Sequence, residues 1–149
     1  EKVLALSGRF ASDPEGRHLR LTAALLEACQ FCANPSNHRN IIRVLSHREY
    51  LGLPAEVIAP ALTGQFVTPG QEALHCPDFL RFSGEDANDP STDKAAWVVQ
   101  HLFDPSVRSR LPPLQLGRIF RSDLFSAAQD LLAANRPSAA SLPASALSA

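Results

Sequence analysis

Cysteine and histidine residues are the first side chains in this sequence that could do chemistry. Cys29 and Cys32 are one helical turn apart, and His75 and Cys76 are adjacent further along the chain. These four residues could together form a zinc site with mixed cysteine and histidine ligands. Structural zinc sites usually take paired cysteines from tight turns, whereas Cys29 and Cys32 fall in an apolar helical stretch. We interpret them as buried thiols that act as small hydrophobic side chains, and we predict no metal.

The other titratable residues do not form a recognisable catalytic motif. The chain has five histidines, His18, His38, His47, His75 and His101. None lies in a nucleophile or zinc motif such as GxSxG or HExxH, and there is no phosphate-binding GxxxxGK[ST] sequence. Asp86, Asp89 and Asp93 bracket a loop, but they lack the ligand spacing and terminal glutamate of a calcium loop. The sequence therefore predicts a protein that is not an enzyme and has no cofactor.

Lys2 is the one candidate ligand for a small anion. It begins a short apolar run, residues 2–6 (KVLAL), which is typical of a brief strand that needs a sheet supplied by other residues. Open α/β sheets bind ligands at the ends of their strands. The alternative interpretation is a solvated lysine with no ligand.

The overall composition excludes several classes of partner. With 14 basic and 15 acidic residues in 149, the net charge is −1, which gives no electrostatic reason to expect a nucleic-acid or anionic-membrane partner. The apolar run at residues 95–99 is far shorter than the roughly 20 residues that a membrane helix needs. The chain opens at Glu1 with no charged and apolar leader, so we expect a secretory signal to be absent or removed. Three cysteines favour a reduced compartment slightly over a disulfide framework.

Helices are expected over most of residues 13–64. Asp13 and Pro14 are typical of a helix start, and this first helix is predicted to run to Ala33. It carries two neighbouring apolar stripes, one of Leu19, Ala23, Leu26 and Cys29 and one of Leu21, Leu25, Ala28 and Cys32. We therefore expect it to be deeply packed. A second helix after Asn34 is predicted to form a helical hairpin with it, burying Ile41, Ile42 and Leu45.

The third helix is predicted between Pro54 and Gly64, with a bend at Pro60. Residues 65–93 are too long for an ordinary connection, so we expect an ordered excursion against another surface. An apolar helix with Trp97 in the core should follow over Ala95–Phe103, and then helical segments at Leu114–Phe120 and Asp123–Ala133, the latter capped by Ser122. The predicted organisation is thus a folded segment, residues 1–134, and a disordered or linker tail, residues 135–149.

Several segments resemble one family of proteins. They are residues 1–6 (EKVLAL), 25–29 (LLEAC), 34–37 (NPSN), 45–58 (LSHREYLGLPAEVI), 77–82 (PDFLRF) and 120–125 (FRSDLF). In type and order they are similar to the C-terminal portion of the nitrate- and bicarbonate-binding proteins of bacterial ABC importers. The resemblance covers residues 1–134 and is most specific around Tyr50–Phe66.

The resemblance implies a fold that is mainly α with minor β, the C-terminal portion of a two-lobed α/β periplasmic-binding-protein-like fold. It implies a role in nitrate assimilation, as part of a solute-binding protein for nitrate or a similar small oxyanion (nitrite or bicarbonate) that feeds an ABC importer. The implied partners are the anion, the importer membrane subunits and the N-terminal lobe of the same protein, which holds most of the pocket. The implied location is periplasmic, or membrane-anchored on the outer side.

The same resemblance implies one site residue, Lys2, and leaves more than one function open. In relatives, a charged residue near the strand that matches Lys2 can help to select the anion, and a cation suits nitrate. Some relatives are cytoplasmic nitrate/nitrite sensors that hold an antiterminator protein, and others fuse a similar domain to the transport ATPase. Residues 88–94 read NDPSTDK where many relatives have NFPWRSH. A function of that loop that depends on aromatic and basic residues is therefore not expected in this chain.

Overall fold

The computed structural model describes residues 3–84, 86–102, 104–110 and 116–135. The described residues are mainly helical with one small sheet, which confirms the predicted fold class, mainly α with minor β. The chain divides into two compact units, unit 1 with Glu1–Ala24 and Pro90–Ala149, and unit 2 with Leu25–Asp89. In the part that the model describes, no helix is both long and apolar enough to cross a membrane.

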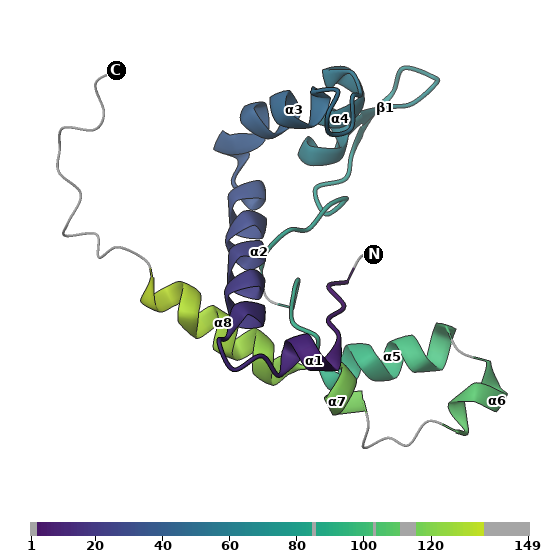
Figure 1. Cartoon of the computed structure of the whole chain (residues 1–149). Coiled ribbons are helices and arrows are strands. Elements are labelled where there is room, and N and C mark those ends of the chain that lie inside the picture. Colours follow the sequence, from purple (N-terminus) through teal and green to yellow (C-terminus); the bar gives the residue numbers. More distant parts are fainter. Residues whose placement is uncertain (1–2, 85, 103, 111–115, 136–149) are drawn as a thin grey trace, which may run out of the picture. The chain divides into compact units, whose positions relative to one another are not determined.

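Unit 1 is built from short and medium helices (Figure 1). Its elements are α1 (Gly8–Ala11), the first half of α2 (Arg17–Ala33), α5 (Thr92–Leu102), α6 (Pro105–Arg108), α7 (Leu116–Ile119) and α8 (Ser122–Ala134). The short helices α1 and α6 were not expected from the sequence. Each is held by a side-chain cap, Ser7 on the N–H of Phe10 and Asp104 on the N–H of Ser106. Such caps satisfy N–H groups that a short helix leaves unpaired.

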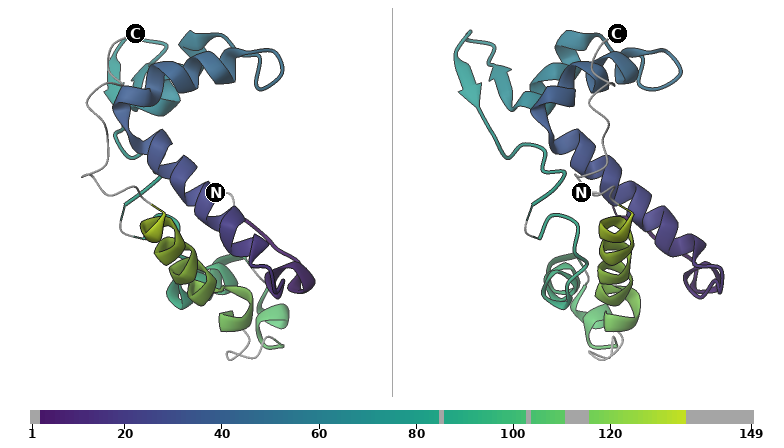
Figure 2. Two further views of the ribbon diagram at one scale, coloured as in Figure 1. Left: turned by 60° about the vertical axis from the view of Figure 1, so that its left-hand side comes forward. Right: turned by 90° about the vertical axis from the view of Figure 1, so that its left-hand side faces the viewer.

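Unit 2 contains the second half of α2, a 3₁₀ turn at Pro35–Asn37, and two helices, α3 (His38–Ser46) and α4 (Ala55–Thr63). The antiparallel strands β1 (Gln65–Val67) and β2 (Ala73–His75) complete it, with Phe66 opposite Leu74. α3 packs mainly against α4, and the two lie side by side in Figures 1 and 2. The predicted hairpin of the first two helices is therefore wrong, because the chain reverses direction in the loop before α4 and not at the Pro35 turn.

The start of α2 differs from the sequence prediction by one turn. The helix begins at Arg17, since residues 14–16 form a turn in which Gly16 adopts a left-handed φ of 67°. Asp13 nevertheless acts as expected on the helix end. Its carboxylate accepts the N–H of Arg17 at 3.0 Å and also pairs with the Arg17 guanidinium at 2.7 Å.

Replacing Asp13 by alanine should destabilise α2 in a pH-dependent way. The side-chain hydrogen bond from Arg17, followed by that from the Arg17 N–H, lowers the pKa of Asp13 to about 2. Because the unfolded value is about 3.9, this carboxylate stabilises the fold above about pH 4, and the contribution is lost as the pH falls through about 2. Thermal unfolding should therefore show a lower Tm for Asp13→Ala at pH 7, with the difference shrinking toward pH 2.

Asp78→Ala is the matched control for this experiment, because Asp78 pairs with Arg81 as an exposed carboxylate. Exposed pairs contribute little to stability, so its Tm should stay close to that of the unchanged protein at both pH values. An equal effect of the two substitutions would show that Asp13 is an ordinary surface charge.

The predicted helix between Pro54 and Gly64 is confirmed as α4. Pro54 precedes the first turn, and Gly64 ends the helix with φ 68° and donates its N–H to the Pro60 carbonyl. The hairpin that follows was not predicted, and it accounts for the first part of the long polar stretch. Its turn runs from Thr68 to Gln71, whose φ is 62°. Residues with this backbone shape are most often glycine, so the sequence signal for a turn was weak.

The helix predicted over Ala95–Phe103 is found as α5, which begins earlier, at Thr92, while Phe103 lies outside the described residues. The position assigned to Trp97 is wrong. Ala95 is fully buried, whereas Trp97 is 57% exposed and stacks on His101 of the same helix, with ring centroids 4.4 Å apart. Among the described side chains of α5, the buried one is therefore small. Ser122 was expected to cap α8, but its hydroxyl donates to the Pro90 carbonyl at 3.1 Å and Arg121 occupies the N-cap position.

Two other sequence predictions concern the ends of the chain. Residues 3–7 adopt no regular secondary structure, so a strand is absent from the described part of the predicted run. A strand needs a paired neighbour, and the described strands, β1 and β2, pair with each other. The tail beyond residue 135 lies outside the described residues, and its disorder stays a prediction.

The buried apolar side chains of the described residues are few and mostly small. They are Ala23, Leu26, Ile58, Ala95 and Ala128. Ile41, Ile42 and Leu45, expected to be buried, are half-buried on α3. α2 buries its stripe of Ala23 and Leu26, but its second stripe is largely exposed, so the expectation of a deeply packed helix holds for one face only.

Candidate functional site

Lys2, the single predicted ligand residue, lies outside the described residues. Its role as an anion ligand stays a prediction. Among the described residues, the features that could hold a small anion are cationic side chains and helix N-termini, because both carry positive charge or free N–H groups.

Two arginines, Arg121 and Arg81, form ion pairs with carboxylates of this chain. Arg121 donates two hydrogen bonds to the Asp123 carboxylate, from Nε at 2.7 Å and from Nη2 at 2.6 Å. Arg81 Nη2 lies 2.9 Å from Asp78 Oδ1. The Arg121 guanidinium lowers the pKa of Asp123, and Asp123 in turn raises the pKa of Arg121. These guanidinium groups already have anionic partners from the chain itself, so they are poorly suited to bind an added oxyanion.

Several helix N-termini are likewise occupied by side chains of the protein. Asp13 fills the end of α2, and Asp104 fills the end of α6. The hydrogen bonds from Ser106 lower the pKa of Asp104, as expected for a carboxylate that remains charged at a helix end. A carboxylate in this position repels a second anion. The ends of α2 and α6 are therefore helix caps and not anion sites.

The cysteines and histidines do not assemble into a centre either. In the described ranges, no group of three or more His, Cys, Asp or Glu side chains could hold a metal ion. Cys29, Cys32 and Cys76 are free thiols of intermediate burial. Burial, and then the neighbouring Cys29, raises the pKa of the Cys32 thiol. A raised pKa disfavours the thiolate that metal binding and nucleophilic attack require.

His18 and His101 make packing and backbone contacts within their own parts of the fold. His18 is buried in α2 with its ring edge-on to Phe10, at 6.4 Å between centroids. The Nδ1 atom of His101 lies 2.8 Å from the Trp97 carbonyl. His75 is exposed on β2, next to Cys76. The stack of Trp97 on His101 could not be predicted from the sequence, because four-residue spacing of two aromatic rings occurs in many helices.

One close backbone contact defines the geometry of unit 2. The Cys76 N–H donates to the Gly64 carbonyl at 2.7 Å, which joins the end of α4 to the residue after β2. Phe66 and Phe79 pack edge to face at 4.7 Å between centroids. These contacts lie in and beside the Tyr50–Phe66 segment, where the family resemblance is most specific. The segment therefore joins α4 to the small sheet. It contains no lysine, arginine or histidine that could bind an anion.

A solved structure shares this fold. The periplasmic nitrate-binding protein NrtA from Synechocystis PCC 6803 aligns with a TM-score of 0.64 and 21% sequence identity, over 77% of this chain and 31% of that chain. This likeness shows the fold and confirms the predicted periplasmic-binding-protein-like architecture for a part of such a protein. No family model matches the chain.

Curated relatives are ATP-binding proteins of import systems. The bicarbonate transport ATP-binding protein CmpC of Synechococcus elongatus is 36% identical over 101 residues, which is 68% of this chain and 14% of CmpC. The nitrate import ATP-binding protein NrtC of Synechocystis is 30% identical over 103 residues, or 68% of this chain and 15% of NrtC. The chain thus spans about a seventh of the length of these relatives. It is similar in sequence to components of nitrate and bicarbonate import systems and similar in fold to a nitrate-binding protein.

Proposed function

We propose that this chain is a segment of the solute-binding part of an ABC import system for nitrate or a similar small oxyanion. One observation carries the proposal, namely that this chain matches importer ATP-binding proteins in sequence over 68% of its length and a nitrate-binding protein in fold over 77% of its length. The whole protein would bind the anion by closure of two lobes, with charge-assisted hydrogen bonds that favour the closed state.

The matched segment is distinct from a nucleotide site. Its sequence has no GxxxxGK[ST] motif, which cradles the phosphates in P-loop ATPases. We therefore infer that the segment itself binds no ATP and does no catalysis. The segment corresponds either to a solute-binding-like domain that is fused to the transport ATPase or to part of a separate binding protein. The names of the relatives favour import over the sensor alternative.

The anion pocket would be built mostly by residues outside the described ranges. Arg121 is paired with a carboxylate, and the N-terminal ends of α2 and α6 are capped by Asp13 and Asp104.

The proposed location is the outer side of the membrane, because the fold neighbour NrtA is described as periplasmic. Protease accessibility of the protein in intact cells with a permeable outer envelope tests that side, and protection would assign the protein to the cytoplasm.

Anion uptake by cells that lack the gene tests the transport role. We expect uptake of labelled nitrate or of labelled bicarbonate to fall severalfold at low anion concentration and to recover when the gene is restored. Unchanged uptake of both anions would contradict a role in import.

Lys2→Ala in the full-length protein should weaken nitrate binding. A charge-assisted hydrogen bond contributes about 1.5–3 kcal/mol, so the Kd for nitrate should rise roughly tenfold to a hundredfold. Lys94→Ala is the matched control, because Lys94 is the other lysine of the chain and lies on α5. Calorimetric titration measures both. An unchanged Kd for Lys2→Ala would identify Lys2 as a solvated lysine.

A further inference from the structure

The surface of α3 divides into an apolar side and a cationic side. At 3.6 residues per turn, Ile41, Ile42 and Leu45 share one side of this helix, and all three are half-buried. Burial on this side agrees with the packing of α3 against α4 within unit 2. Arg39 and Arg43 fall on the other side, one helical turn apart, and both are exposed.

We call the exposed side of α3 the cationic face, and we define it by Arg39, Asn40, Arg43 and Val44. All four residues are exposed. Among the residues that the structure describes, neither Arg39 nor Arg43 forms an ion pair with a carboxylate, whereas Arg81 of the same unit is paired. The two guanidinium groups of the cationic face therefore have N–H donors available for an anionic partner.

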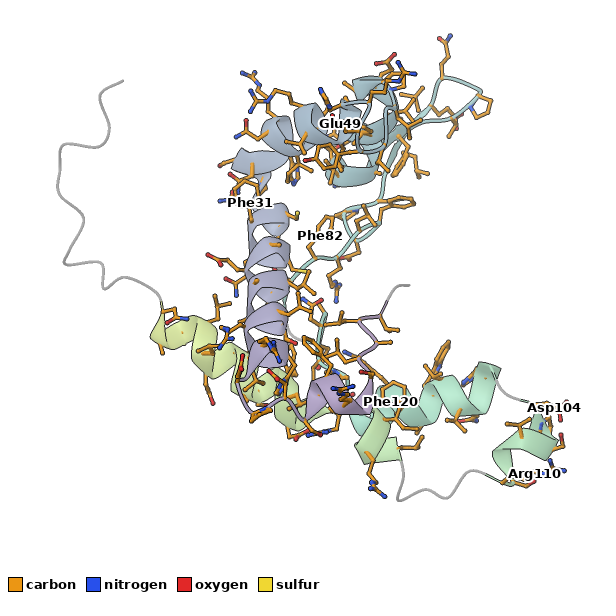
Figure 3. All side chains as sticks on the ribbon, in the orientation of Figure 1. Phe31, Glu49, Phe82, Asp104, Arg110 and Phe120 are labelled. Carbon is orange, nitrogen blue, oxygen red and sulfur yellow. The ribbon has the colours of Figure 1, made fainter. Side chains whose placement is uncertain are left out.

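The charges of unit 2 are separated along its sequence. Residues 28–48 contain three of the four arginines in residues 25–89 and no aspartate or glutamate. Phe31 and Glu49, both labelled in Figure 3, lie near the two ends of this acid-free stretch. The rest of residues 25–89 contains eight acidic residues. The cationic face is therefore a local feature, which the net charge of −1 for the whole chain conceals.

The number of cations favours an acidic protein segment over a polyanion as the partner. Clusters that bind anionic membranes usually contain about four to eight lysines or arginines, and tight DNA binding uses about six to ten phosphate contacts. The acidic residues elsewhere in unit 2 would also repel an extended polyanion. Two arginines are enough for a protein partner, because each can hold one carboxylate with two parallel hydrogen bonds.

We propose that the cationic face of α3 is a docking surface for an acidic segment of a partner protein. The helical rise separates Arg39 and Arg43 by about 6 Å along the axis. Carboxylates four residues apart on a helix, or two apart on one face of a strand, have a matching spacing of about 6–7 Å. Val44, which is 44% exposed, adds an apolar contact at the edge of the face. Arginine is also enriched among the residues that contribute most to the stability of protein interfaces.

Binding of fluorescent poly-L-glutamate to the full-length protein tests the proposal. Arg39→Glu combined with Arg43→Glu reverses the charge of the cationic face. Arg110→Glu combined with Arg118→Glu is the matched control, because both residues are exposed in unit 1 and the net charge changes equally. At low salt, we expect the Kd measured by fluorescence anisotropy to rise at least about tenfold for the first pair and less than about twofold for the control. Equal rises for the two pairs would overturn the proposal.

A neutral variant keeps the test valid if the charge reversal unfolds the protein. Arg39→Gln combined with Arg43→Gln keeps side chains of similar polarity on an exposed surface, where substitutions change stability by about 0.5 kcal/mol or less. Its Tm should therefore stay close to that of the unchanged protein, while its Kd for poly-L-glutamate should still rise severalfold. An unchanged Kd in this folded variant would contradict a docking role for the two arginines.

Duplex DNA and vesicles of phosphatidylserine with phosphatidylcholine test the class of partner. We expect both to bind the full-length protein more weakly than poly-L-glutamate does. Tighter binding of either one, lost when Arg39 and Arg43 are replaced, would overturn the assignment to a protein partner. None of these measurements uses nitrate, nitrite or bicarbonate, so a failure of the proposed docking surface and a failure of the proposed function can be told apart.

Discussion

Gly64→Ala is expected to lower the free energy of unfolding by about 3 kcal/mol or more, a larger loss than alanine should cause at any other described glycine. A Cβ atom at position 64 would lie within van der Waals overlap of the Cys76 carbonyl oxygen and 2.8 Å from the Cys76 carbonyl carbon. Both are backbone atoms, held by the hydrogen bond between the Cys76 N–H and the Gly64 carbonyl. The left-handed φ of 68° adds about 1–2 kcal/mol for any residue with a Cβ.

Gly16→Ala separates the two causes. Gly16 has almost the same φ, 67°, but a Cβ there would meet no heavy atom within 4 Å. Gly16→Ala should therefore cost only the backbone contribution of about 1–2 kcal/mol. Urea unfolding of the two variants gives the difference directly. Equal losses for Gly64→Ala and Gly16→Ala would show that the close approach of Cys76 does not restrain unit 2.

Ile58→Ala is expected to cost about 2–5 kcal/mol, as typical of large-to-small changes at buried positions. Ile58 is 6% exposed and is the residue that α4 buries. Few other large apolar side chains are buried among the described residues, so unit 2 has little other packing with which to compensate. The expected result is a clear fall in Tm.

Ile58→Val provides the graded control, because it removes one methylene group and keeps the branched shape. Its cost should be about 0.5–1.5 kcal/mol. If the two substitutions lowered the free energy of unfolding by the same small amount, Ile58 would not be part of a packed core, and the contact between α3 and α4 would need another explanation.

The parts of the fold that were predicted correctly are those with strong local signals. Pro54 and Gly64 bracket α4, as the sequence predicted. The β1–β2 hairpin was missed, because its turn places Gln71, and not glycine, at a positive φ. The contact of α3 with α4 depends on a chain reversal whose direction no local pattern specifies. Trp97 was placed in the core because it lies in an apolar helical stretch, but burial depends on what packs against α5.

The candidate site was predicted less well than the fold, for a physical reason. An anion site needs cations and N–H groups from separate parts of a chain to converge, and sequence spacing does not report convergence. The structure showed that Arg121 and Arg81 are paired with carboxylates close by in sequence. The Asp13 cap was visible in the sequence, yet its consequence for anion binding at α2 became clear only from the contact with the Arg17 N–H.

Calorimetric titration of the full-length protein with nitrate, nitrite and bicarbonate tests the central claim most directly. We predict saturable binding of at least one of the three anions, and little or no binding by the 149-residue chain alone, because most of the pocket would lie outside it. Micromolar binding by the isolated chain would contradict the inferred position of the pocket. Flat titrations of the full-length protein with all three anions would contradict the proposed function.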